Sequence, residues 1–200
     1  MIHFLGWTRK SITFSIDDGD IPNDIKFLDI VRPAGILGTF NISSPIRTTH
    51  EHYRELYRGY EIANHCAHHP LLMMEEQDFN IPEDKTHWLY TVRESNLLSG
   101  MKLYENYPDD ENLKVIVIGV HARDYERNEK WDDLRSFAEI YGNRPDDYYY
   151  AINIDINEYE AAVKSLIIGE STVENPTDKD IYMTVLGERV ILKAKSKISY

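Results

Sequence analysis

The 200-residue chain has one cysteine, a deficit of basic residues and no long apolar run. The lone Cys66 excludes an internal disulfide and a multi-cysteine zinc site. With 22 Lys and Arg against 34 Asp and Glu, the net charge is −12, which argues against a nucleic-acid backbone as the main partner. No apolar stretch approaches the roughly 20 residues of a membrane-spanning helix. The composition therefore predicts no nucleic-acid and no membrane partner, and it leaves neutral ligands such as sugars open.

The first residues, MIHFLGWTRK, lack the basic leader and apolar run of a secretory signal. With the single cysteine, this favours the cytoplasm, although a mature chain whose leader had been removed would look the same. A hydrophobic content of 42% and a charged content of 28% are ordinary for a globular protein. We expect one domain, or one domain with a small appendage.

Apolar patterning predicts strands that alternate with helices. Residues 11–16 alternate apolar side chains and stop at an Asp-Gly turn. A strand, a helix and a second strand within residues 11–42 form a βαβ unit, which implies parallel pairing. The predicted strands cover residues 11–16, 35–42, 61–64, 113–120 and 148–154, and the predicted helices cover 23–31, 50–60, 86–103, 131–141 and 157–168. After Gly169 the period changes to two, and residues 181–185 and 190–194 predict a β-hairpin.

Reactive side chains follow three of these predicted strands. Asp17 and Asp18 end the first, a histidine cluster ends the third, and His121 ends the most apolar one. Because the carboxyl ends of parallel strands meet at one sheet edge, we expect these groups to lie together. Adjacent carboxylates repel each other unless a cation, a basic partner or a shared proton relieves them. An Asp-Asp-Gly tripeptide alone is more typical of an acidic turn, but the joint arrival of three such strand ends favours a site.

His65 and His69 lie four residues apart, so both imidazoles point one way if the segment is helical or tightly turned. His68, between them, is expected to point elsewhere. Two histidines and a carboxylate, with a fourth position for water, are the ligands of a catalytic zinc-like site. A histidine pair alone is as often a surface feature. The set predicts a divalent metal, zinc in first place, with cobalt or nickel as alternatives.

The segments SITFSIDDGD, GILGTFNI and GYEIANHCAHHP resemble polysaccharide deacetylases of the NodB-homology type (carbohydrate esterase family 4). The first motifs of that family take the forms TFDDG and H[ST]xxxHP. The later segments VIGVHARDYER, YYYAINIDINEYEAAVKSL and NPTDKDIYMTVLGERVIL are similar to a bacterial subgroup of the family. The resemblance covers most of the chain, and the ordered combination of motifs is specific.

The resemblance implies a role for each of these residues. Asp17 would be the catalytic base, and Asp18, His65 and His69 would hold the divalent metal. His121 would be the late histidine of the family, its general acid. The implied function is a metal-dependent hydrolase that removes N- or O-acetyl groups from a polysaccharide or oligosaccharide, with an acetylated sugar as its substrate.

Two departures from the family pattern open alternatives. Cys66 replaces the usual Ser or Thr, and the region between Pro70 and Leu113 lacks the Arg- and Pro-containing motif that orients the base and builds the oxyanion site. Arg93 or Arg123 is a candidate replacement for that arginine. One alternative is a non-catalytic, deacetylase-like binding or interaction protein. Another is a metal-dependent hydrolase of a different amide.

The shortened middle also shapes the expected fold. Five parallel strands are fewer than the eight of a closed barrel, so we expect an α/β fold, an incomplete or distorted (β/α) barrel with mostly parallel strands. Residues 1–169 would form the NodB-like deacetylase domain, and residues 170–200 a C-terminal β-hairpin appendage packed on it. The exposed strand edges require cover from the hairpin or from a second subunit, which makes a homodimer an expectation.

Overall fold

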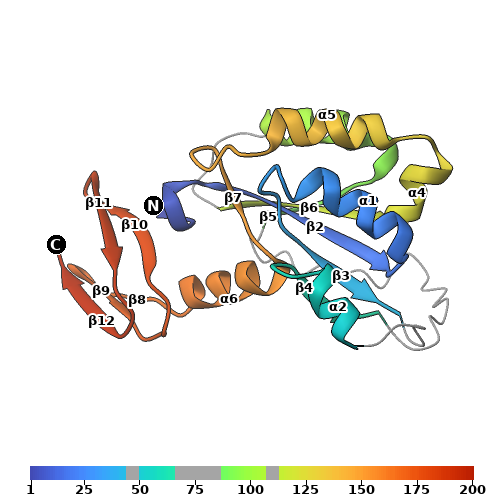
Figure 1. Cartoon of the computed structure of the whole chain (residues 1–200). Helices are drawn as coiled ribbons and strands as arrows, with labels where there is room; N and C mark the ends of the chain where they lie inside the picture. The colour runs from blue at the N-terminus through green and yellow to red at the C-terminus, as the bar shows by residue number, and fades with distance from the viewer. Residues whose placement is uncertain (44–49, 66–86, 107–112) are drawn as a thin grey trace, which may run out of the picture.

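The computed structural model describes residues 1–43, 50–65, 87–106 and 113–200 (Figure 1). Its centre is a sheet of parallel strands in the order β4-β3-β2-β6-β5. The five strands are β2 (Lys10–Asp18), β3 (Gly38–Ile42), β4 (Glu61–Asn64), β5 (His87–Val92) and β6 (Lys114–His121). This arrangement confirms the prediction of an α/β fold with a mostly parallel sheet.

One face of the sheet carries most of the helices, as Figure 1 shows for α1, α4 and α5. Alternate residues of the central strands point to this face because strand side chains alternate, and they form its hydrophobic core with the helices. The helices with buried residues in this core are α1 (Ile21–Val31), α3 (Leu97–Glu105), α4 (Ala122–Arg127) and α5 (Trp131–Tyr141), joined by Tyr57 after α2 (His50–Leu56). The strand residues in the core are Ile12, Phe14, Ile16, Ile116, Ile118 and Val120.

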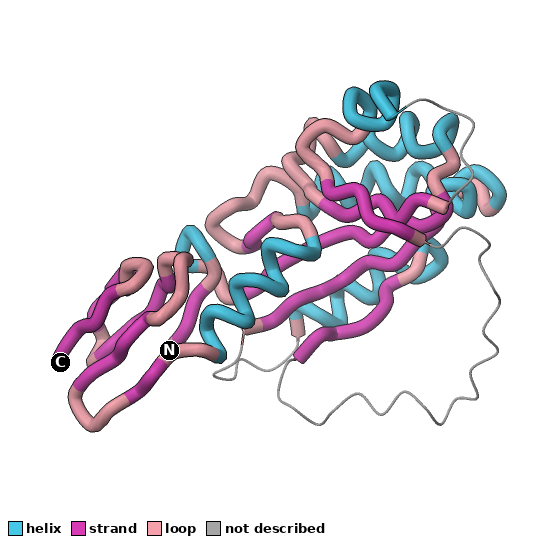
Figure 2. The backbone as a smooth tube through the Cα atoms, turned by 90° about the horizontal axis from the view of Figure 1, so that it is seen from below, coloured by secondary structure: helices cyan, strands magenta, loops and turns pink. Residues whose placement is uncertain are grey.

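The opposite face is covered by α6 (Asn153–Lys164), which crosses in front of the strands in Figure 2. A second core joins this helix to the antiparallel strands beyond it, through Phe4, Val115, Ile156, Val173 and Ile181 among others. Those strands are β1 (Ile2–His3), β8 (Ile167–Ile168), β9 (Thr172–Asn175), β10 (Ile181–Val185), β11 (Glu188–Leu192) and β12 (Ser196–Ser199). They pair as β1-β10-β11 and β12-β9-β8. The predicted hairpin is present as β10 and β11, and the first strand of the chain pairs with it.

The start of α6 is held by hydrogen bonds at a fork in the sheet. On one side of β2, its first residues pair with β7 (Tyr148–Tyr150) and its later residues pair with β3. At this fork the Thr13 hydroxyl donates to Asn153 Oδ1 at 3.0 Å, and the Asn153 backbone N–H donates to Thr39 Oγ1 at 3.1 Å. Glu61 Oε2 accepts from the Thr39 hydroxyl at 2.6 Å and from the Ile154 N–H at 3.2 Å. A carboxylate from β4 thus satisfies an N–H group in the first turn of α6, which has no partner inside the helix.

Two predicted elements are wrong. The helix predicted over residues 86–103 is replaced, from residue 87 on, by strand β5, the 3₁₀ turn Glu94–Asn96 and helix α3, which begins at Leu97. The segment HWLYTV is rich in aromatic and β-branched residues, and pairing with the long apolar β6 decides its state. The predicted strand over residues 148–154 ends at Tyr150, and α6 begins four residues earlier than expected because its cap comes from β4.

Among the helices in the described ranges, none is both long and apolar enough to cross a membrane.

The fork yields a stability prediction. Glu61→Ala removes the acceptor shared by the Thr39 hydroxyl and the Ile154 N–H, so the free energy of unfolding should fall by about 1–2 kcal/mol, the usual cost of losing a helix cap. Urea denaturation followed by circular dichroism measures it. The matched control is Glu174→Ala. Glu174 is another strand glutamate, and it forms an exposed ion pair with Lys197 at 3.8 Å, so its loss should cost less than about 0.5 kcal/mol. Equal losses in the two variants would contradict the capping role.

Candidate active site

The carboxyl end of β2 lies between polar residues of both neighbouring strands. In the register of the sheet, Asp17 stands opposite His121 of β6 on one side and Asn41 of β3 on the other. His65 follows β4, and its backbone N–H donates to the Ile42 carbonyl at the end of β3 at 3.1 Å. The parallel topology therefore brings together four of the five predicted site residues, namely Asp17, Asp18, His65 and His121. The fifth, His69, lies outside the described residues.

Asp17 is held by an amide. The Asn41 side chain donates to Asp17 Oδ1 at 2.7 Å and lies 2.8 Å from Ser15 Oγ on the same face of β2. Asp17 keeps 28% of its side chain exposed, so it remains accessible to a water molecule or a ligand. Sequence reasoning missed Asn41, although a polar residue near the end of the otherwise apolar segment GILGTFNI was a usable signal.

Asp18 occupies the centre of the cluster and a left-handed backbone conformation. Its φ of 79° is followed by a φ of 74° at Gly19, so the chain turns sharply here; a non-glycine residue with positive φ is uncommon, though Asp tolerates it. Asp18 Oδ1 lies 3.7 Å from His65 Nε2, and Asp18 Oδ2 lies 3.6 Å from His121 Nε2. Arg123 Nη2 forms an ion pair with the same Oδ2 at 2.7 Å. The cationic partner that two adjacent carboxylates require is present.

His121 is bracketed by carboxylates. Its Nδ1 lies 3.2 Å from Asp124 Oδ2 on the short helix α4, and its Nε2 faces Asp18. Asp124 is nearly buried and also pairs with Arg127, at 2.8 Å. A buried carboxylate on one ring nitrogen fixes the orientation of an imidazole and leaves the other nitrogen for proton transfer. Asp124 was missed in the sequence, although its position three residues after His121 in HARDYER was visible.

The two candidate arginines do not orient Asp17 in this structure. Arg123 contacts Asp18 instead. Arg93 follows β5, whose last register partner is Ile118, three residues before His121 in β6, and its backbone N–H donates to Asn96 Oδ1. Asp17 instead accepts a hydrogen bond from the neutral amide of Asn41.

The described ligand pair fits a metal only in part. Tetrahedral zinc with bonds of 2.0–2.1 Å places its donor atoms roughly 3.3 Å apart, and the 3.7 Å between Asp18 Oδ1 and His65 Nε2 is close to that spacing. The carboxylate and the imidazole are donors that zinc accepts. No group of three or more His, Cys, Asp or Glu side chains in the described part of the chain is arranged to hold a metal ion. The third ligand that the resemblance implies, His69, is outside that part.

A buried acid lies in the helix that follows the two carboxylates. Asp24, in the first turn of α1, is fully buried, and its Oδ2 accepts from the Tyr57 hydroxyl at 2.6 Å. Burial raises the pKa of Asp24 to about 7. The hydrogen bond from Tyr57 lowers this pKa, whereas the negative charges of Asp20 and Asp18 raise it further. Burial and the neighbouring Asp24 also raise the pKa of Tyr57, which stays protonated.

Comparisons with protein-family models, with curated proteins and with solved structures give no match to this chain.

Asp24 yields a pH-dependent stability prediction. Its folded pKa of about 7 exceeds its usual value of 3.8, so folding favours the protonated form. The stability that the protonated Asp24 contributes to the fold is fully present below about pH 4 and is lost as the pH rises through 7. Asp24→Asn keeps an acceptor for Tyr57 and has no charge, so the variant should be about 2–4 kcal/mol more stable than the natural chain above pH 7, with little difference near pH 4.

Urea denaturation at a series of pH values checks this prediction. Asp29→Asn, on the exposed side of the same helix, is the matched control and should leave the pH dependence unchanged. If the Asp24→Asn variant were less stable than the natural chain at pH 8, burial of the charged Asp24 carboxylate would not be destabilising, and the prediction would be wrong.

Proposed function

We propose that this protein is a metal-dependent carbohydrate deacetylase that removes N- or O-acetyl groups from a polysaccharide or oligosaccharide. The observation that carries the proposal is the convergence of Asp17, Asp18, His65 and His121 at one sheet edge. The resemblance of the same residues to the NodB-homology motifs supports the reaction class.

The roles divide around Asp18. Asp18 Oδ1 faces His65 and Oδ2 faces His121, so the proposed ligand side and the proposed acid side lie on opposite oxygens of one carboxylate. Asp18, His65 and His69 would hold the metal, zinc in first place. When bound there, a divalent metal supplies Lewis-acid polarisation of the acetyl carbonyl and a more acidic water.

The remaining residues move protons. Asp17, steadied by the Asn41 amide, takes a proton from the attacking water as general base. His121, oriented by Asp124, donates a proton to the departing amine or alcohol. Partial exposure of Asp17 and His121, at 28% of each side chain, leaves both groups within reach of a substrate.

A non-catalytic binding protein is the second candidate. The ion pair between Arg123 and Asp18 favours it, because this contact engages one oxygen of the proposed ligand at 2.7 Å. In that case the same residues form a polar cluster that recognises a glycan without cleaving it. Acetate release separates the two functions.

Three wider features belong to the same proposal. The sheet would be part of an incomplete or distorted barrel, with β4 and β5 at the two ends of its described path. A homodimer would cover such edges. The single cysteine agrees with action in the cytoplasm, where disulfides are rare.

The proposal predicts separable effects on metal binding and turnover. Asp18→Ala and His65→Ala should each remove the metal and the activity together, because each loses a ligand. Asp17→Asn should keep the metal and lose turnover, because only the base is removed. Elemental analysis of the purified protein measures the metal, and acetate release from acetylated chito-oligosaccharide with added zinc or cobalt measures turnover.

Asp20→Asn is the matched control for this series. Asp20 follows the same turn but accepts a hydrogen bond from Asn23 at 3.0 Å within the start of α1, so its variant should retain metal and activity. Hydrolysis retained in the Asp17→Asn protein would defeat the assignment of the base. Stoichiometric metal without any acetate release would favour the binding protein.

Asp124 gives a second, independent test of the mechanism. Asp124→Asn should lower kcat by about 10- to 100-fold with a small change in KM, because the imidazole of His121 loses the carboxylate that orients it at 3.2 Å. Arg127→Gln removes the exposed partner of Asp124 and should have a much smaller effect on kcat. A loss confined to KM in the Asp124 variant would place that residue in substrate binding instead.

A further inference from the structure

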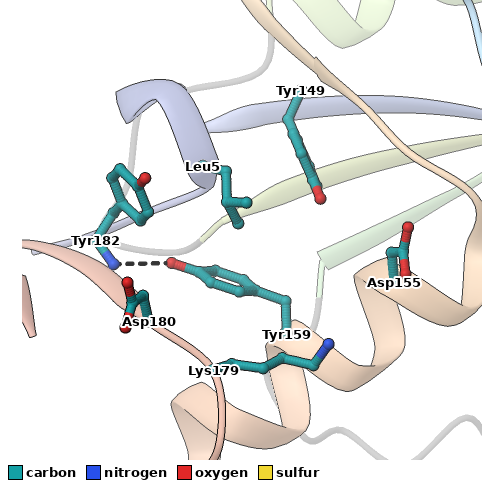
Figure 3. A pocket seen from close by; sticks show the side chains of 7 residues that line it. All are labelled: Leu5, Tyr149, Asp155, Tyr159, Lys179, Asp180 and Tyr182. Carbon is teal, nitrogen blue, oxygen red and sulfur yellow. Dashed lines mark hydrogen bonds between the residues drawn. The ribbon is translucent and has the colours of Figure 1, made fainter. Parts of the chain in front are cut away.

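A cavity of about 350 Å³ lies far from the candidate active site, between α6 and the start of β10. Leu5 and the rings of Tyr149, Tyr159 and Tyr182 supply its apolar and aromatic walls, and Asp155, Lys179 and Asp180 supply its charges. Figure 3 shows the Tyr149 side chain reaching into the space above Tyr159. The volume is at the lower end of the range for small-molecule sites, which suits a ligand of about one ring.

The cavity is at the opposite end of β2 from Asp17. Tyr149 pairs with Ser11, near the start of the strand, whereas Asp17 is six residues further along. At about 3.3 Å per residue, the two sites are roughly 20 Å apart along the sheet. A ligand in the cavity therefore contacts none of the proposed catalytic groups.

Most polar groups around the cavity are already engaged. Lys179 pairs with Glu158 at 2.7 Å, and Asp180 pairs with Lys193 at 2.8 Å. The Tyr159 hydroxyl donates to the His3 carbonyl and accepts from the Tyr182 N–H, so its ring rather than its oxygen is offered to the cavity. These contacts engage the polar groups of Lys179, Asp180 and Tyr159 before any ligand binds.

Two groups have no such partner. Neither the Asp155 carboxylate nor the Tyr149 hydroxyl forms a hydrogen bond or ion pair with any residue in the described ranges. Burial raises the pKa of Tyr149, and the nearby charge of Asp155 raises it further. After the two ion pairs cancel, Asp155 gives the side chains that line the cavity a net charge of −1.

This lining selects a cationic ligand that also carries hydroxyl groups. The free carboxylate and the electron-rich faces of tyrosine rings both attract an ammonium group, whereas an anion would meet Asp155 in a chain of net charge −12. The Tyr149 hydroxyl can donate to or accept from a ligand hydroxyl. The apolar walls fit the hydrocarbon face of a ring.

We propose that the cavity between Tyr149, Asp155 and Tyr159 is a second, non-catalytic site that binds an amino-sugar ring, with its ammonium group on Asp155. The choice of an amino sugar rests on the proposed function, whose N-deacetylation product carries that amine. The site would hold deacetylated units of a chain while acetylated units reach the catalytic residues.

Titration calorimetry with glucosamine, N-acetylglucosamine and glucose tests the site. We expect glucosamine to bind with a Kd on the order of 1 mM, as for a ligand of about a dozen atoms, and the two neutral sugars to bind more weakly. Asp155→Asn should weaken glucosamine binding about tenfold. The matched control Asp132→Asn, in the first turn of α5 and 94% exposed, should leave it unchanged.

A second variant guards against loss of folding. Tyr149→Phe removes only a hydroxyl, and it should weaken glucosamine binding while circular dichroism and the thermal midpoint stay near those of the natural chain. Equal binding of glucosamine and N-acetylglucosamine, or equal affinity in the natural and Asp155→Asn proteins, would overturn the proposal. Binding of tetramethylammonium as tight as that of glucosamine would also overturn it in favour of a general cation site.

Binding and hydrolysis fail separately in this design. Asp17→Asn should bind glucosamine as the natural chain does, because the cavity is at the other end of β2. A protein that binds glucosamine through Asp155 but releases no acetate would keep the cavity site and refute the deacetylase. A protein that releases acetate but binds no glucosamine would do the reverse.

Discussion

Two adjacent carboxylates at the end of a buried strand are the constraint around which this protein is organised. Asp17 and Asp18 can both remain at the end of β2 only if neighbouring groups offset their charge. The sheet supplies those groups from both sides, since β3 brings an amide to Asp17 while the helix after β6 brings Arg123 to Asp18. The two carboxylates thus have different partners, a neutral donor for Asp17 and a cation for Asp18.

The central position of β2 extends this constraint to the whole fold. β2 pairs with three strands. Its residues Ile12, Phe14 and Ile16 belong to the hydrophobic core on one face, and on the other face Thr13 donates a hydrogen bond to Asn153 at the start of α6. The same strand therefore connects the edge that carries the candidate active site to the fork at which α6 begins. The tyrosine-lined cavity at the far end of β2 depends on where α6 begins, because α6 carries Asp155 and Tyr159. The two proposed sites thus lie at opposite ends of the same strand.

The apolar pattern of the sequence correctly predicted those helices and strands whose conformation depends mainly on their own residues. The apolar run of β6, the amphipathic spacing of α5 and the period-two hairpin at β10 and β11 each carry enough signal in one segment. Prediction failed where a distant partner decides. HWLYTV became β5 because β6 offers an edge to pair with. Helix α6 begins early because Glu61, some ninety residues earlier, accepts a hydrogen bond from the Ile154 N–H in its first turn.

The candidate site divides in the same way. The sequence by itself determined which reactive groups follow the strands, because residues at the carboxyl ends of parallel strands must share an edge. Only the tertiary structure decided their partners: Asn41 on Asp17, Arg123 on Asp18, Asp124 on His121 and Tyr57 on the buried Asp24. Register and helix packing set those contacts, and both depend on segments that are remote in the chain. The physical reason is that the position of a residue at a strand end sets where its side chain leaves the backbone, whereas the packing of remote segments decides which groups that side chain contacts.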